Sequence, residues 1–157
     1  MTPAIKALQK AKAQFRIHEY RHAPGTASYG QEAAEKLGVA PQRVFKTLVV
    51  AFDNGSCAVA VVPVNAQLGM KQIARAAGAK KAAMAEGVQV QRLTGYVLGG
   101  VSPIAQKRRL RTFIDSTAQQ FDTIFVSAGR RGLEIELRPQ ALQRQTHAQF
   151  TDLAVSD

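Results

Sequence analysis

The chain has 157 residues, 46% of them apolar, which fits one compact globular domain and excludes a largely disordered chain. Lys and Arg number 21 against 11 Asp and Glu, giving a net charge of +10. Such an excess favours a polyanionic partner such as nucleic acid, the alternative being a basic surface that serves only solubility. Only 6% of the residues are aromatic and none is Trp, which disfavours a broad base-stacking platform.

Two further exclusions concern the compartment. Cys57 is the single cysteine, so the chain cannot form an internal disulfide. The N-terminal residues enter an amphipathic pattern directly, without the apolar core of a signal peptide, and no run approaches the ~20 apolar residues that span a bilayer. We therefore expect a cytoplasmic protein without a membrane segment.

The first half of the chain alternates between helical and extended patterns. Thr2 and Pro3 are typical of a helix start, and a helix is predicted from there to about residue 13. Four elements are expected next: a short strand near 15–20, a helix over 31–37 closed by Gly38, and strands over 44–52 and 57–64. The turn residues 53–55 make the last two a hairpin.

The second half continues this mixture. The predicted elements are a helix over 70–77, an extended piece over 80–84, a helix over 86–93, strands over 110–114, 123–127 and 133–137, a turn over 128–132, a helix over 139–145 and an extended end over 150–155. Interleaved helices and hairpins predict a mixed α/β fold, with a sheet curled towards a barrel and flanked by helices. One domain, residues 1–157, accounts for the whole chain.

The chain lacks the usual sequence motifs of catalysis. There is no nucleophile elbow, Walker loop, His-Glu-x-x-His or paired-cysteine zinc site. His18, His22 and His147 have no cysteine pair or acidic cluster beside them, which disfavours a metal site. Cys57 begins an apolar strand, where a buried structural thiol is expected rather than a catalytic thiolate. Catalysis, if there is any, must come from positioning and electrostatics.

Two segments could supply it. Lys46 lies in an apolar strand, either as a gatekeeper on a sheet edge or as a charge pointing into a cleft, and the pattern does not decide between them. Gly99 and Gly100 lie in a loop ending in Ser102 and Pro103, where backbone amides could converge on an oxyanion. The alternative is an ordinary tight loop between a helix and a strand.

Three ordered motifs together resemble one family. They are Phe45-Lys46-Thr47-Leu48-Val49-Val50, the segment Gly95 to Pro103, and the segment Val126 to Leu137. The chain resembles the YbaK family, free-standing relatives of the editing domain inserted in bacterial prolyl-tRNA synthetases, and within it the Cys-tRNA(Pro) deacylases. The resemblance implies a mixed α/β fold with a barrel-like sheet. It also implies hydrolysis of cysteine wrongly esterified to proline tRNA, in trans beside prolyl-tRNA synthetase and without a cofactor.

The resemblance also assigns site residues. The family's required lysine falls on Lys46, and its substrate loop on Gly99, Gly100, Val101, Ser102 and Pro103. Pocket positions fall on Tyr20, Tyr29, Ser127 and Glu134. Close relatives often have aspartate in place of Glu134, which could adjust the size of the pocket, and Ala105 departs from the usual Ser-Pro-Leu-Gly.

The implied mechanism needs no protein nucleophile, because the substrate's own sulfur attacks the ester carbonyl. Loop amides around Gly99 and Gly100 would stabilise the developing oxyanion, and Lys46 would hold the terminal phosphate or orient the aminoacyl group. Basic residues expected to contact the acceptor stem are Lys107, Arg108, Arg109, Arg130 and Arg131. We expect a monomer. Two alternatives stay open: a deacylase for alanyl- or seryl-tRNA, which would have to position water, and a non-catalytic tRNA or synthetase adaptor.

Overall fold

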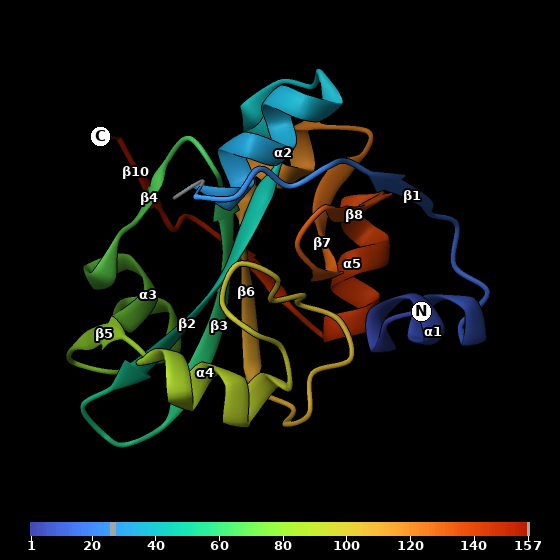
Figure 1. Ribbon diagram of the computed structural model, residues 1–157. Coiled ribbons are helices and arrows are strands. Elements are labelled where there is room, and N and C mark those ends of the chain that lie inside the picture. Colours follow the sequence, from blue (N-terminus) through green and yellow to red (C-terminus); the bar gives the residue numbers. More distant parts are fainter. Residues whose placement is uncertain (26–27, 157) are drawn as a thin grey trace.

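The computed structural model describes residues 1–25 and 28–156, and Figure 1 shows how the elements are arranged. Within these residues the elements are α1 (Pro3–Lys10), β1 (Arg16–Glu19), α2 (Tyr29–Leu37), the 3-10 turn η1 (Pro41–Arg43), β2 (Phe45–Phe52), β3 (Cys57–Pro63), β4 (Gln67–Leu68), α3 (Met70–Ala77), β5 (Ala82–Met84), α4 (Gly87–Thr94), β6 (Arg111–Asp115), η2 (Ser116–Gln120), β7 (Ile124–Arg130), β8 (Leu133–Leu137), α5 (Pro139–Thr146), β9 (Gln149–Thr151) and β10 (Ala154–Val155). Each α-helix, and each strand of four or more residues, lies where the sequence predicts one. None of the described helices combines the length and apolar character needed to cross a bilayer.

The described strands form three sheets. The largest has the order β5-β2-β3-β6-β9 and is mixed: β2 runs antiparallel to β3 and β5, whereas β3–β6 and β6–β9 are parallel pairs. The second sheet, β1-β8-β7, is antiparallel, and β10 pairs with β4 in the third. The mixed α/β class is therefore correct. The expected barrel-like curl is not supported, because each of these sheets is open, with two edge strands.

The core lies on both faces of β3, as a buried central strand requires. Val59 and Val61 pack towards one cluster with α1, α5 and the β7–β8 hairpin, while Ala60 and Val62 pack towards a second cluster with Ile73 of α3. Residues 58 to 62 are all at most 1% exposed. Continuous burial explains why this strand is an apolar run without alternation.

The two larger sheets meet at the start of β2. Val44 forms an isolated parallel bridge with Phe125 of β7, and its carbonyl accepts a hydrogen bond from the Val64 amide at 2.8 Å. Both side chains are buried. This junction places the first residues of β2 beside the β7–β8 hairpin, although about 80 residues of chain separate them.

The β7–β8 connection is tighter than predicted. We expected a turn over residues 128–132, but β7 continues to Arg130 through an irregular register between Ser127 and Arg130. Gly129 has a φ of 109°, a left-handed value that glycine adopts without strain. The bulge therefore lengthens the strand and shortens the turn.

Candidate active site

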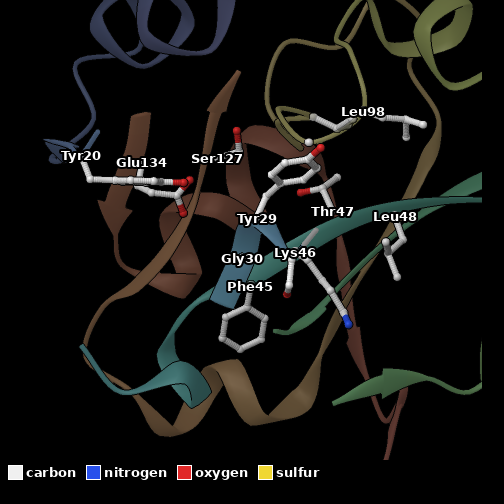
Figure 2. Close-up of a pocket in the computed structure, with 13 residues that line it drawn as sticks. Tyr20, Tyr29, Gly30, Phe45, Lys46, Thr47, Leu48, Leu98, Ser127 and Glu134 are labelled. Carbon is white, nitrogen blue, oxygen red and sulfur yellow. The ribbon is translucent and has the colours of Figure 1, made fainter. Parts of the chain in front are cut away.

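A cavity of about 270 Å³ lies where β2, the β7–β8 hairpin, the start of α2 and the 95–104 loop converge, and Figure 2 shows it in close-up. Its lining combines aromatic, aliphatic and a few polar side chains, as small-molecule sites do. The lining residues are Tyr20, Ser28, Tyr29, Gly30, Phe45, Lys46, Thr47, Leu48, Leu98, Gly99, Val101, Ser127 and Glu134.

Strand β2 brings Lys46 and Thr47 to the cavity. Lys46 is half-buried and pairs with Val62 of β3, whereas β5 pairs with residues 50–52 at the other end of β2. The Lys46 side chain lines the cavity, which is the second of the two alternatives that the sequence left open. Beside it, the Thr47 hydroxyl is buried and has no hydrogen-bond partner among the described residues. A buried polar atom without a partner is costly, so Thr47 is a further candidate for contacting a ligand.

Only some of the loop residues that were predicted to contact substrate line the cavity. Gly99 and Val101 line the cavity, and in the described part of the chain their amides donate no hydrogen bond within the protein. Gly100 lies away from the lining, and its amide donates to the Val97 carbonyl at 3.0 Å. The Gly100 amide was predicted to donate a hydrogen bond to the oxyanion. It donates to the Val97 carbonyl instead, so it is not available for that role.

The role of Gly100 is steric. A Cβ atom at this position would lie 2.9 Å from the Cα atom of Arg130, closer than folded proteins allow. The loop can therefore rest directly on the bulged end of β7. Gly99 has a φ of +89°, which a residue with a side chain adopts only with strain.

Ser102 and Pro103 lie behind the loop and outside the cavity lining. The Ser102 side chain is fully buried, and its hydroxyl accepts a hydrogen bond from the Ile104 amide at 3.3 Å. Tyr96 fixes the same turn, because its hydroxyl donates to the Ile104 carbonyl at 2.7 Å. Pro103 instead lines a separate shallow depression. Nothing in the geometry of the cavity supports the predicted contact of these two residues with substrate, because neither of them lines it.

The inner wall holds Tyr20, Ser127 and Glu134. Ser127 and Glu134 are direct partners across the β7–β8 pair. Glu134 is 7% exposed, accepts no hydrogen bond from the described residues, and has its pKa raised by burial to about 8. Burial, with the nearby Glu134 charge, raises the pKa of Tyr20 to about 12, so that its phenol stays a neutral donor. Ser127 accepts a hydrogen bond from the Gly129 amide at 3.1 Å.

The basic residues predicted to contact tRNA form two groups, both exposed. Arg130 and Arg131 end the β7–β8 hairpin beside the loop, and the Arg131 guanidinium lies over the ring of Tyr29. The other three, Lys107, Arg108 and Arg109, follow the loop, and the amides of Lys107 and Arg108 donate to the carbonyls of Thr94 and Leu93 at the end of α4. Arg108 and Arg109 line the separate depression with Pro103.

Six lining residues were missed from the sequence: Ser28, Gly30, Phe45, Thr47, Leu48 and Leu98. Phe45, Thr47 and Leu48 are neighbours of Lys46 on β2. If Lys46 is predicted to line a cleft, its neighbours on the strand can be predicted to line it as well. Nothing in the local sequence indicated Gly30. A glycine is needed at this position because the side chain of Val64, which is distant in sequence, occupies the space where a Cβ atom would lie.

The structure also places the residues of other possible chemistries. Cys57 is half-buried, and its sulfur lies 3.5 Å from the Gln89 amide nitrogen, outside the cavity lining. Within residues 1–25 and 28–156, no three His, Cys, Asp or Glu side chains gather closely enough to hold a metal ion. The site therefore offers a lysine, hydroxyl groups, a buried carboxyl group and backbone amides.

Comparison with known proteins identifies the family. Residues 23–145 match the model of the aminoacyl-tRNA editing domain. The chain is 36% identical, over 99% of its length and 94% of the relative's, to an Enterococcus faecalis protein named putative Cys-tRNA(Pro)/Cys-tRNA(Cys) deacylase EbsC. It is 30% identical to the uncharacterized Bacillus subtilis protein YwhH over 71% of each chain. A crystal structure of a putative trans-editing enzyme for prolyl tRNA synthetase shares the fold, with a TM-score of 0.82 over 99% of both chains at 22% identity. The chain thus belongs to the aminoacyl-tRNA editing domain family, as a member of the YbaK type.

Proposed function

We propose that this protein hydrolyses cysteine wrongly esterified to proline tRNA, with the substrate's own sulfur as the nucleophile. The observation that carries this proposal is the makeup of the cavity. It combines Lys46 with the amides of Gly99 and Val101, and no cysteine or histidine of the described chain lines it. The Ser127 hydroxyl accepts a hydrogen bond from the Gly129 amide and, within the described residues, donates none to a base. Such a site suits a substrate that brings its own nucleophile.

The reaction divides into two steps. The cysteinyl thiol loses its proton, and its sulfur attacks the ester carbonyl carbon while the carbonyl electron pair moves to oxygen. Collapse of this oxyanion breaks the bond to the terminal adenosine, whose oxygen takes up a proton as it leaves, and a cyclic thioester remains. Water then adds hydroxyl to the carbonyl carbon and hydrogen to sulfur, which releases free cysteine.

The cavity residues have separate tasks in these steps. The amides of Gly99 and Val101 stabilise the oxyanion, a kind of contact whose loss typically costs ~2.7–4 kcal/mol in other enzymes. Lys46 holds the terminal phosphate or orients the aminoacyl group. Glu134 faces the α-ammonium group, whose positive charge favours the ionised carboxylate over the neutral acid. Tyr20, Tyr29 and Thr47 enclose the amino acid.

Thiol chemistry also explains how proline is spared. Cysteine and proline are similar in size, and a methylene-scale difference supplies only ~1–3 kcal/mol of discrimination. A correctly charged prolyl ester has no thiol, so it cannot enter the first step. We propose further that Lys107, Arg108, Arg109 and Arg130 contact phosphates of the acceptor stem. Prolyl-tRNA synthetase is the proposed partner for choosing the tRNA, with the editing protein acting as a monomer.

The decisive experiment is a panel of proline tRNAs carrying cysteine, serine, alanine or proline, assayed with and without prolyl-tRNA synthetase. Only the cysteinyl ester should be hydrolysed at a rate well above its spontaneous loss. Serine is the matched control, since it replaces only the sulfur with oxygen. Turnover of the seryl or alanyl ester would instead indicate an activated water. Binding without cleavage of any ester would indicate an adaptor.

Two variants test the residue assignment in the same panel. Lys46→Ala should lose most deacylation of the cysteinyl ester, and near wild-type activity in that variant would place the site elsewhere. Cys57→Ser should keep full activity, because Cys57 lies outside the cavity lining. An inactive Cys57→Ser protein that is still folded would mean that the enzyme supplies the thiol.

A further inference from the structure

Three parts of the molecule meet at the mouth of the cavity without room for another atom. A Cβ atom at Gly99 would lie 2.5 Å from the Nε atom of Arg131 and 2.7 Å from Cε2 of Tyr29. Gly99, Tyr29 and Leu98 all line the cavity. The glycine therefore allows the turn of the hairpin, the start of α2 and the loop to touch at one point.

Arg131 contacts both other parts directly. Its Cζ atom lies 4.1 Å from the centre of the Tyr29 ring, a close cation–π contact, and its Nη2 atom donates to the Leu98 carbonyl at 3.2 Å. Leu98 immediately precedes Gly99, whose amide faces the cavity in the proposed mechanism. The exposed guanidinium thus joins the wall of the cavity to the segment that carries the amides.

Tyr29 also contacts a histidine that is hydrogen-bonded to a buried carboxyl group. The His22 ring lies 5.5 Å from the Tyr29 ring, and its Nδ1 atom lies 2.7 Å from Oε1 of Glu32. Glu32 is 5% exposed and also accepts a hydrogen bond from the Ala23 amide at 2.8 Å. Tyr29 therefore contacts His22, which Glu32 anchors, and Arg131, whose guanidinium also bonds to the loop at Leu98.

We infer that Arg131 is a positioning residue of the aminoacyl site, which holds Tyr29 against the Leu98–Gly99 segment and so fixes the Gly99 and Val101 amides. This inference rests on the proposed deacylase function and gives Arg131 a task other than the phosphate contact predicted from the sequence. The task requires an arginine. A planar guanidinium can stack on a ring and donate in its own plane at once, whereas a lysine ammonium is a point charge without a plane.

The test compares Arg131→Lys and Arg131→Ala with Arg144→Lys, a change at an exposed arginine of α5. A phosphate contact needs only the charge, so Arg131→Lys would then resemble the wild type. A positioning residue predicts that both Arg131 variants lose kcat on the cysteinyl ester by about 10-fold or more, the loss expected for a charged hydrogen bond and a cation–π contact together. The KM for the charged tRNA and the salt dependence of binding should stay unchanged, and Arg144→Lys should behave as the wild type.

Hydrogen exchange of the Gly100 amide, which donates to the Val97 carbonyl, gives a second readout that does not depend on activity. We expect faster exchange there in both Arg131 variants and unchanged exchange in Arg144→Lys. Wild-type exchange in Arg131→Ala, or wild-type kcat in Arg131→Lys, would overturn the inference. If the wild-type protein hydrolyses no ester, the proposed function fails, while the exchange measurement still decides whether Arg131 holds the loop.

Discussion

Two carboxyl groups on strand β8, those of Glu134 and Glu136, have pKa values shifted in opposite directions by their surroundings. Burial would raise the pKa of both, but Glu136 receives hydrogen bonds from Thr123 at 2.5 Å and from His18 at 2.9 Å, and its pKa is lowered. Glu134, two residues earlier, has no such donors, and its pKa rises to about 8. Glu134 thus stays largely protonated at pH 7, and in the proposed reaction the α-ammonium group of the substrate favours its ionised form.

The buried Glu134 also predicts how stability depends on pH. Its pKa is about 4.5 when exposed and about 8 when folded, so the folded protein keeps a proton that the unfolded chain loses. The free energy of unfolding should therefore fall as pH rises from 5 to 8, by at most about 1.4 kcal/mol per pH unit from this group. Urea unfolding at several pH values should show that Glu134→Gln removes this contribution.

The matched control is Glu35→Gln, which changes an exposed carboxylate of α2. Its stability should follow the wild-type pH profile. Profiles for Glu134→Gln and the wild type that run parallel from pH 5 to 8 would mean that Glu134 is already ionised in the folded protein. In that case the substrate ammonium would meet a preformed carboxylate.

At the scale of elements, the site depends on a loop lying directly on a strand. Backbone contact between Gly100 and Arg130 sets the height of the 95–104 loop above the β7 bulge. Tyr96 supports the same arrangement, since its ring occupies the space beside Gly129 and its hydroxyl holds Ile104. Contacts outside the cavity, those of Gly100 with Arg130 and of Tyr96 with Gly129 and Ile104, thus set the distance between the loop amides and Lys46.

Gly100→Ala should therefore damage catalysis without touching the substrate. The added methyl group must push the loop away from the Arg130 backbone, and overpacking of this kind typically costs 1–3 kcal/mol. We expect kcat for the cysteinyl ester to fall by at least tenfold and thermal stability to fall moderately. Gly69→Ala is the matched control away from the cavity, since its methyl group meets side chains only, the flexible end of Gln72 and Cγ1 of Val155 at 3.0 Å. Equal activity in the two variants would show that the height of the loop is unimportant.

The helices and the β2–β3 hairpin could be predicted from the sequence, whereas the residues that line the cavity could be predicted only in part. The β2–β3 hairpin was predicted because Asp53, Asn54 and Gly55 separate two apolar runs, and Gly38 and Gly78 end their helices in the left-handed conformation as expected. These features depend on neighbours in sequence. The bulge in β7 and the pairing of β10 with β4 depend on distant segments, so no local pattern indicates them.

The family resemblance pointed to residues that lie around one cavity, but it did not assign every side chain near them. Seven of the residues that it indicated line this cavity: Lys46, Tyr20, Tyr29, Gly99, Val101, Ser127 and Glu134. Ser102 and Pro103 belong to the same motif but lie outside the cavity lining, because a sequence motif can reflect the backbone path of a loop as well as contacts with a ligand. Sequence alone cannot separate these two requirements.

Across the whole molecule, several acidic groups hold the chain in place, whereas the basic residues that follow the 95–104 loop face solvent. Several of the 11 acidic residues accept hydrogen bonds from the protein itself: Asp115 binds the amides of Leu153 and Ala154 at 2.8 and 2.9 Å, and Asp53 binds those of Lys80 and Lys81. Acceptors used in this way fix loops and the C-terminal segment. The basic side chains of residues 107–109 remain exposed for a polyanion.

This distribution predicts where tRNA binds, through the salt dependence of its affinity. Each phosphate contact contributes about 0.7–0.9 to the slope of log affinity against log salt concentration. Replacing Lys107, Arg108 and Arg109 with Gln should make the slope shallower by about 2–3. Replacing Lys6, Lys10 and Lys12 near the N-terminus removes the same charge and should change the slope by less than 1. Equal slopes for the two triple variants would mean that overall charge attracts the tRNA, without a defined contact at 107–109. A selective effect would instead place the acceptor stem on the side of the loop where Arg108 and Arg109 flank Pro103, so that its terminal adenosine must cross the loop to reach Lys46.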